Sequence, residues 1–324
     1  MEQTVDKRAE MMGTAKVPSA IVRLAVPAIV SMVVMAVYNM ADTYFVSLSP
    51  EGYLGTAAVS VYMPIMLLTQ ALSVLFAAGG GAYLSRLLGA KEKEKAGRTA
   101  TATILLAFLS GVLVAVVGSI FAEPVLLALG ASGDTIGLAL DYALILLLAS
   151  PVQLTKMAFN NLLRAEGSAV QSMTGMVIGA VLNIILDPVF IFTFDMGVMG
   201  AAAATALSQG VAFVLLASNY WRKKTVARFR LKGFRFEKEI VAYIVRIGSS
   251  TFLTQLLAAV GFAVINICAK PYGDAAIAAF GIVNRIQFLG FALMFGFTQG
   301  YQPVAGYNFG AHRFGRLKTA MKFG

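Results

Sequence analysis

Long apolar stretches alternate with short polar segments along almost the whole chain. A helix needs about 20 mostly apolar residues to cross the roughly 30 Å of hydrocarbon in a bilayer. Eight stretches are of this order: residues 18–48, 54–84, 98–121, 135–160, 170–194, 198–221, 240–269 and 274–303. The pattern therefore predicts an all-α, polytopic integral membrane protein with eight transmembrane helices.

The composition agrees with this prediction. Hydrophobic residues make up 58% of the chain and charged residues 13%, and the mean hydropathy is +0.77. These values exclude an ordinary soluble globular domain. The segment before the first apolar stretch is polar and lacks the apolar core and cleavage site of a signal peptide. We therefore expect the first span to be retained.

Basic residues are concentrated in four polar segments on one side of the predicted spans, and cytoplasmic loops are enriched in Lys and Arg. The basic segments hold Lys7, Arg8, Lys16 and Arg23; Arg86, Lys91, Lys93, Lys95 and Arg98; nine bases from Arg222 to Arg246; and four from Arg313 to Lys322. The alternate segments hold Glu51, Glu123, Asp134, Asp195 and Asp274, with Lys270 as their one base. We expect a multi-pass protein of the inner (plasma) membrane whose N-terminus and present C-terminus are both cytoplasmic.

The net charge of +10 is compatible with nucleic-acid binding, but the bases are spread over one side of the bilayer. Membrane lipids, and not nucleic acid, are their expected partners. Cys268 is the only cysteine, which excludes an intrachain disulfide and a cysteine metal cluster. His312, the only histidine, has no recognisable nucleophile motif beside it. We expect neither an enzyme nor a bound cofactor, and we expect a monomer.

Short motifs recur at a nearly constant offset, which predicts an internal repeat. Ile21-Val22-Arg23 matches Ile244-Val245-Arg246, and Leu88-Gly89-Ala90-Lys91 matches Phe309-Gly310-Ala311-His312. The offsets of the two matches agree to within a short insertion or deletion. An even number of spans separates the copies, so the repeats are expected to be parallel.

The repeat divides the chain into four parts. Residues 1–17 form a cytoplasmic N-terminal segment, 18–221 a six-helix N-lobe, 222–239 a basic cytoplasmic linker, and 240–324 a partial C-lobe of two helices and a tail. A complete second copy would add four more helices after Gly324. We therefore expect the natural protein to be longer than this chain.

Asp42 and Asp187 are carboxylates that lie within apolar spans, where a charge is costly and usually functional. Asp42 lies in the run 24–48, and Asp187 lies in 170–194. They are six residues from Leu48 and eight from Asp195, or about 9 and 12 Å from the outer helix ends at 1.5 Å per residue. Both are therefore expected at similar depth in the outer half of the membrane.

The fifth span supplies further ligands beside Asp187. Asn183 is four residues earlier and points from the same helix face. Pro188 cannot donate a hydrogen bond to the carbonyl of Ile184, which leaves an acceptor free. These oxygens suit a proton or a small hard cation, and favour sodium over a transition metal. Thr205 and Tyr142 can complete the set. The alternative is that both aspartates only fix helix packing.

Two backbone features bear on helix packing. Pro27 removes a backbone hydrogen bond to Arg23, and this predicts either a bendable first helix that responds to Asp42 or a static kink. The run Gly79-Gly80-Gly81 is expected to allow close helix contact instead of binding phosphate.

Five motifs together resemble the multidrug and toxic compound extrusion (MATE) family. They are Leu24-Ala25-Val26-Pro27, Tyr38-Asn39-Met40-Ala41-Asp42-Thr43, Ser85-Arg86-Leu87-Leu88-Gly89-Ala90, Leu182-Asn183-Ile184-Ile185-Leu186-Asp187-Pro188, and Pro303-Val304-Ala305-Gly306-Tyr307-Asn308-Phe309-Gly310-Ala311. The two aspartates look most like the DinF-type branch.

The resemblance implies a twelve-helix, two-lobed exporter. Such a protein exchanges small organic compounds, often cations, for H⁺ or Na⁺ by alternating access. The family's cation network carries over onto Asp42, Tyr142, Asn160, Asn183, Asp187 and Thr205. Of these, Asp42, Asn183, Asp187 and Thr205 are the possible Na⁺ ligands. Tyr38 and Pro27 match the adaptable part of the first helix.

Other functions remain open at this point. A flippase for a lipid-linked or polysaccharide precursor belongs to the same superfamily, but predicts a basic groove. Apart from Arg285 and Lys156, the chain has almost no base at membrane depth. A membrane-embedded transferase would need a catalytic constellation that His312 alone does not supply. A non-transporting membrane subunit is the third alternative. We expect a secondary active multidrug antiporter.

Overall fold

The structure is a computed structural model, and it describes residues 9–131, 133–222, 225–227, 229, 235–269 and 274–324. Within these ranges it contains no strand, and residues 9–14 are helical. The helices that follow are α2 (Val17–Ser47), α3 (Tyr53–Gly89), α4 (Lys93–Ile120), α5 (Ala122–Ala128), α6 (Ile136–Ala165), α7 (Ala169–Pro188), η1 (Val189–Thr193), α8 (Gly197–Trp221), α9 (Lys238–Ala269), α10 (Asp274–Gly310) and α11 (Phe314–Phe323).

Each of the eight predicted spans coincides with a long helix. They correspond to α2, α3, α4, α6, α7, α8, α9 and α10. Among the residues that the structure describes, seven helices are long and apolar enough to cross a membrane. The eighth, α10, has 37 residues. The prediction of an all-α, polytopic membrane protein is confirmed.

Several helices extend beyond their apolar stretches. Helix α3 ends at Gly89, α6 at Ala165 and α10 at Gly310, each past the end of its predicted span. A helix satisfies its own backbone hydrogen bonds, so it can leave the hydrocarbon and continue with polar side chains. The apolar pattern does not predict α5 and α11, because their 7 and 10 residues are too few for a span.

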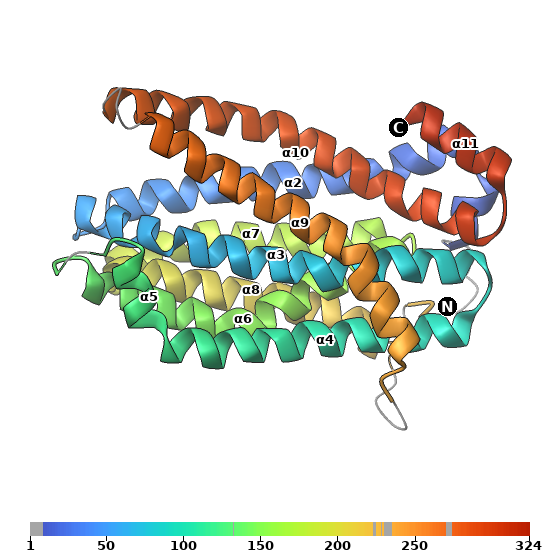
Figure 1. The fold of residues 1–324 in the computed structure, drawn as a ribbon, viewed down its shortest axis with the longest axis horizontal. Coiled ribbons are helices and arrows are strands. Elements are labelled where there is room, and N and C mark those ends of the chain that lie inside the picture. Colours follow the sequence, from blue (N-terminus) through green and yellow to red (C-terminus); the bar gives the residue numbers. More distant parts are fainter. Residues whose placement is uncertain (1–8, 132, 223–224, 228, 230–234, 270–273) are drawn as a thin grey trace.

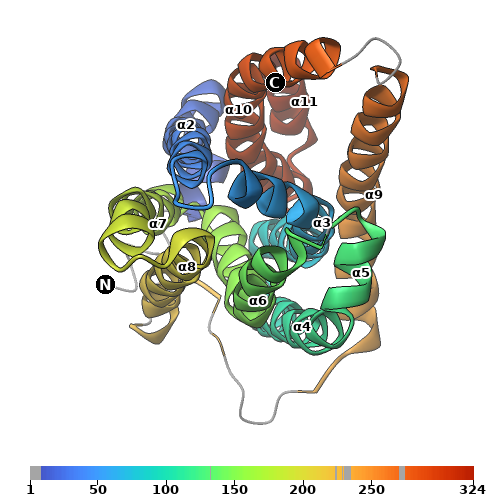
Figure 2. The same cartoon turned by 90° about the vertical axis from the view of Figure 1, so that its left-hand side faces the viewer.

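The helices from α2 to α8 pack around one another, and α9 and α10 lie against one side of them (Figure 1, Figure 2). Helix α10 packs along α2 and α3, and α9 packs along α3. The division into an N-lobe, a linker and a partial C-lobe remains a prediction. In that division, α3 of the N-lobe contacts both helices of the C-lobe.

The turns at one end of the bundle include those with Lys16, Lys91 and Arg313, which belong to three of the basic segments of the sequence. We call this end the basic end, and it contains residues 9–16, 90–92, 166–168, 225–227 and 311–313. It lies to the right in Figure 1, together with α11. Helix α5 and the turn between α2 and α3 lie at the opposite end.

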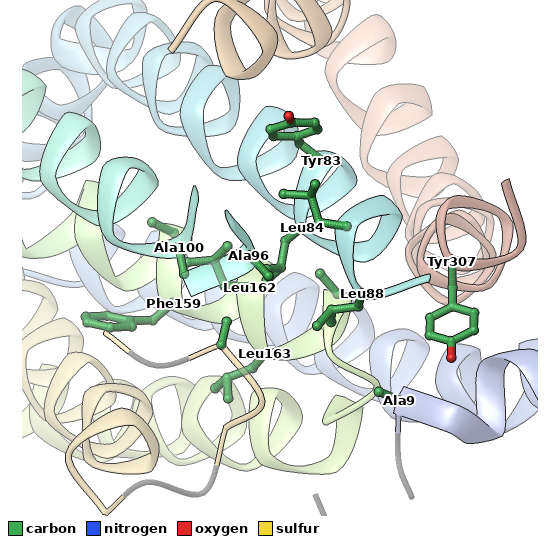
Figure 3. Packing of buried hydrophobic residues seen from close by; sticks show 14 of the residues in the cluster. Ala9, Tyr83, Leu84, Leu88, Ala96, Ala100, Phe159, Leu162, Leu163 and Tyr307 are labelled. Atoms are coloured by element: carbon green, nitrogen blue, oxygen red, sulfur yellow. The ribbon is translucent and has the colours of Figure 1, made fainter. Parts of the chain in front are cut away.

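The core at the basic end joins the N-terminal group of helices, α2 to α8, to the C-terminal group, α9 and α10. Figure 3 shows residues from α3, α4, α6 and α10 gathered there, among them Leu84, Leu88, Ala96, Ala100, Leu162, Leu163 and Tyr307. Glycines allow the helices to approach closely. A side chain at Gly80 would overlap Thr103 of α4, and one at Gly79 would overlap the main chain of Ile244 in α9. Close helix contact at this glycine run is confirmed.

Candidate functional site

Asn183 links a carboxylate on its own helix to a hydroxyl on the next. Its side-chain Nδ2 donates to Oδ1 of Asp187, one turn later in α7, at 3.1 Å, and to Oγ1 of Thr205 in α8 at 3.2 Å. Asp187 is 0% exposed, Asn183 1% and Thr205 7%. Both N–H bonds of the amide are therefore engaged inside the bundle.

The close approach of α7 and α8 explains this contact. Gly175, Gly179, Asn183 and Asp187 follow one another at four-residue intervals on α7, and therefore share a face. A Cβ at Gly175 would overlap Leu216 of α8, and one at Gly179 would overlap Ala212. The two glycines bring the helices together, and the next turns of the same face are occupied by the polar pair.

Helices α2 and α6 add three groups to this site. Asp42 in α2 lies near enough to Asp187 for the two carboxylates to interact electrostatically. Tyr38, one turn before Asp42, and Tyr142 of α6 interact with both aspartates. The Tyr142 ring packs edge-on against Tyr62, with ring centroids 5.5 Å apart. The site therefore joins α2, α6, α7 and α8.

Three oxygen atoms of the site are buried without a hydrogen-bond donor among the described residues. They are Oδ1 of Asp42, Oδ1 of Asn183 and Oδ2 of Asp187. Buried polar atoms are costly unless they are paired. A proton on a carboxylate, or a cation bound between the oxygens, would supply the missing partner. No group of three or more His, Cys, Asp or Glu residues suited to a metal occurs in the described part of the chain.

The sequence pattern does not predict the backbone geometry beside Asp187. Helix α7 ends at Pro188 and continues as the single π-helical turn η1. There the N–H of Phe194 donates to the carbonyl of Val189 at 3.0 Å, five residues earlier. Such turns often occur at functional sites. Pro188 is the only signal for it in the sequence, since it interrupts the α-helical hydrogen bonds.

The structure does not bring Asn160 to this site. Its Oδ1 accepts a hydrogen bond from Ser172 in the first turn of α7. Ser172 precedes Asn183 by about three helical turns, or about 16 Å along the helix at 1.5 Å per residue. Asn160 thus lies towards the basic end, in a separate polar contact between α6 and α7.

The two predicted residues of the first helix take different positions. Tyr38 belongs to the site, whereas Pro27 precedes Asp42 by about four helical turns, or about 22 Å along α2. Helix α2 continues through Pro27, and Ser31 donates to the Pro27 carbonyl at 2.9 Å. Pro27 can therefore influence Asp42 only through the shape of α2.

Sequence reasoning missed a buried acid at the basic end. Glu166, 0% exposed, follows α6 and accepts hydrogen bonds from the N–H groups of Val226 at 2.9 Å and Ala227 at 3.2 Å, and from the Tyr220 hydroxyl at 3.4 Å. Burial raises the pKa of Glu166 to about 8, against the opposing effect of these donors. The available signal was an acidic residue in a polar segment on the predicted cytoplasmic side, between the fourth and fifth spans.

Arg164, two residues earlier, is 5% exposed and was also missed. Its guanidinium donates to Oε1 of Gln299 in α10 and, at 2.8 Å, to Oδ1 of Asn161. These side chains line a small cavity together with Gln302 and Pro303 of α10. Arg164 thus forms a polar contact between the N-terminal helices and α10.

Comparisons with known sequences and structures all indicate one protein family. The family model MatE matches residues 27–189 and 251–324. The multidrug export protein MepA of Staphylococcus aureus is 31% identical over 94% of this chain. A solved structure of MATE in complex with MaD3S gives a TM-score of 0.94 at 31% identity, over 98% of this chain and 71% of its own.

A second solved structure is described as the outward-facing conformation of a multidrug resistance MATE family transporter of the MOP superfamily. It gives a TM-score of 0.90 at 32% identity, over 94% of this chain. The present chain spans 67% of that structure and 67% of MepA.

Proposed function

Because this chain belongs to the MATE family of multidrug efflux transporters, we propose that it exports small organic compounds, often cations, as a secondary active antiporter. The exchanged ion is H⁺ or Na⁺, and transport proceeds by alternating access. The observation that carries the proposal is the set of unpartnered buried oxygens on Asp42, Asn183 and Asp187. Members of this family are transporters and not enzymes.

The two carboxylates give the site its affinity for a cation. Asp42 and Asp187 interact with each other, and like charges repel strongly where the dielectric constant is low. One bound proton or sodium ion removes this repulsion. An all-oxygen set that includes Asn183 and Thr205 has the chemistry that sodium requires.

Cation binding is coupled to helix position because the two carboxylates are on different helices. Asp42 belongs to α2, and Asp187 belongs to α7. A cation shared between them favours the arrangement in which α2 lies against α7. A substrate that favours another position of α2 is then linked to the ion, because each ligand shifts the same equilibrium.

The membrane potential and the proton gradient are sufficient for export. A potential of about 100 mV contributes about 2.3 kcal/mol per charge, and one pH unit contributes about 1.4 kcal/mol. Together they support a roughly few-hundred-fold gradient of a neutral drug per proton. The basic end faces the cytoplasm in this proposal, as the distribution of Lys and Arg indicates.

Efflux of a fluorescent organic cation from cells that express the protein tests the proposal. We expect Asp187→Asn to abolish efflux at unchanged membrane expression. Asp141→Asn is the matched control, since Asp141 is an exposed carboxylate of α6 and should tolerate the same change. If the wild-type protein exports no such cation, or if Asp187→Asn matches it, the proposal is wrong.

The coupling ion is determined in inside-out vesicles from the same cells. Substrate uptake driven by a pH gradient at constant sodium identifies H⁺. Uptake that follows an imposed sodium gradient at constant pH identifies Na⁺. In vesicles that contain Asp187→Asn, we expect neither a proton gradient nor a sodium gradient to drive substrate uptake.

A further inference from the structure

Helices α3 and α10 cross at the basic end with main chain against main chain. A Cβ atom at Gly89 of α3 would overlap the carbonyl oxygen of Tyr307 in α10. A Cβ atom at Gly310 of α10 would overlap the carbonyl oxygen of Arg86 in α3. Neither glycine has a positive φ, so both are needed for the close approach and not for an unusual backbone conformation.

The two contacts are copies of one another. The offset along the chain from Gly89 to Gly310 equals the offset from Arg86 to Tyr307. This is the offset of the repeated Gly-Ala motif. Each glycine therefore contacts the carbonyl that is equivalent to the one contacted by the other, as expected at a local two-fold axis.

The turns that follow the crossing are also equivalent. After α3, the N–H of Glu92 donates to the Leu87 carbonyl at 3.0 Å. After α10, the N–H of Arg313 donates to the Asn308 carbonyl at 2.9 Å. The intervening residues Lys91 and His312 both have positive φ, 63° and 55°. Both helices thus end in the same type of C-terminal turn. The chain therefore leaves α3 and α10 in equivalent directions.

A second equivalent pair of contacts extends the interface away from the crossing. Gly79 of α3 lies against the main chain of Ile244 and Gly248 in α9, and Gly300 of α10 lies against Ala25 in α2. In the repeat, Gly300 is the counterpart of Gly79, and Gly248 is the counterpart of Ala25. Each pair joins a helix of the N-terminal group to one of the C-terminal group.

Side chains add little that would lock the crossing. The Arg86 guanidinium lies over the Phe309 ring, 4.8 Å from its centroid. Figure 3 shows Leu88 of α3 near Tyr307 of α10 at this end. Among the described residues, no ion pair joins α3 to α10. The crossing therefore depends on shape, and it can separate without breaking an ion pair between these two helices.

We propose that this reciprocal crossing of α3 and α10 is the cytoplasmic gate of the transporter, and that Gly89 and Gly310 keep it closed. The inference rests on the alternating access of the proposed function. A methyl group at either position overlaps a carbonyl oxygen only while the helices touch. The substitution thus penalises the closed state alone and shifts the population towards a state that is open at the basic end.

The structure offers control substitutions that separate opening of the gate from the general effects of replacing a helical glycine by alanine. Gly290 also lies in α10, and no atom lies within 4 Å of an added Cβ. Gly290→Ala therefore changes helix propensity in the same helix without a clash. Gly80→Ala would overlap Thr103 of α4, within the N-terminal group. It is expected to lower thermal stability without opening the gate.

The test measures the distance between the two sides of the gate. Spin labels are placed at Glu92→Cys and Lys318→Cys, both exposed, after replacement of the single cysteine by Cys268→Ser. Pulsed electron–electron double resonance is recorded on the protein in lipid nanodiscs. We expect Gly89→Ala and Gly310→Ala each to shift the distribution to longer distances, whereas Gly290→Ala and Gly80→Ala leave it unchanged.

A milder variant covers the case in which these proteins do not fold. A Cβ at Gly306 in the crossing meets the movable hydroxyl of Ser85, so Gly306→Ala should give a smaller shift in the same direction. If folded Gly89→Ala, Gly310→Ala and Gly306→Ala give the same distance distribution as the wild type, the proposal of a gate is wrong. The readout needs no substrate, so longer distances support the gate even if the efflux assay fails.

Discussion

The carboxylate of Glu166, at the end of α6, accepts a hydrogen bond at 2.9 Å from the main-chain N–H of Val226, far along the chain. The segment after α8 is thereby held against the basic end of the preceding helices. Replacing this side chain by a methyl group leaves the N–H groups of the partly buried Val226 and the buried Ala227 without their acceptor.

We predict that Glu166→Ala lowers the free energy of unfolding by roughly 1–3 kcal/mol, the range for buried groups that lose a partner. Amide exchange at Val226 and Ala227, followed by mass spectrometry, should accelerate. Glu94→Ala is the control, because its ion pair with Arg98 is on the surface and is worth less than about 1 kcal/mol. Unchanged exchange at Val226 would contradict the assignment.

The stability of the protein should also depend on pH through Glu166. Its pKa is raised from an ordinary value of 4.5 to about 8 in the folded protein, so the folded state binds the proton more tightly than the unfolded state. This contribution is complete below about pH 4.5 and is lost as the pH rises through 8. As the pH rises from about 4.5 to about 8, the melting temperature of Glu166→Gln should fall less than that of the wild type.

Asn183 is predicted to be essential because it holds Asp187 and Thr205 together. Asn183→Ala leaves the carboxylate without its donor, and hydrogen bonds to charged groups are worth about 1.5–3 kcal/mol. We expect efflux to fall roughly tenfold or more. Asn219→Ala is the control, since Asn219 bonds only to carbonyls of its own helix. Equal efflux by both variants would remove Asn183 from the site.

Asn308 should anchor the N-terminal segment. Its amide donates to the Met12 carbonyl at 2.9 Å and to Val304 of its own helix at 2.8 Å, and Asn308 is 0% exposed. We predict that Asn308→Ala exposes residues 9–16 to limited proteolysis. Thr319→Ala is the comparison, because this exposed hydroxyl bonds only within α11. The same cleavage rate in both variants would argue against the anchor.

Pro27 is expected to keep α2 adaptable. In Pro27→Ala the new N–H can donate to the Arg23 carbonyl, which should raise the unfolding free energy by roughly 1–3 kcal/mol. A stiffer α2 should slow efflux severalfold. Pro64→Ala makes the same chemical change at an exposed position of α3 and should stabilise without slowing. If efflux by Pro27→Ala equals that of the control, the proline is only a static kink.

The sequence alone determined the helices, because the length of an apolar run is set by the thickness of the bilayer. It also identified Asp42, Asp187 and Asn183, since a charge at membrane depth stands out from its neighbours, and residues four apart share a helix face. The repeat could also be recognised in the sequence, because each copy of the Gly-Ala motif is a run of consecutive residues.

Tertiary structure alone decided which polar residues meet. Tyr142 and Asn160 lie on the same helix, yet they are five turns apart, or about 27 Å at 1.5 Å per residue, and only Tyr142 reaches Asp187. The hydrogen bond that Glu166 accepts from Val226, and the contacts of Gly89 and Gly310 with opposing carbonyls, join segments far apart in the chain. Helical periodicity fixes the face on which a residue lies, but the packing of one helix against another selects its partner.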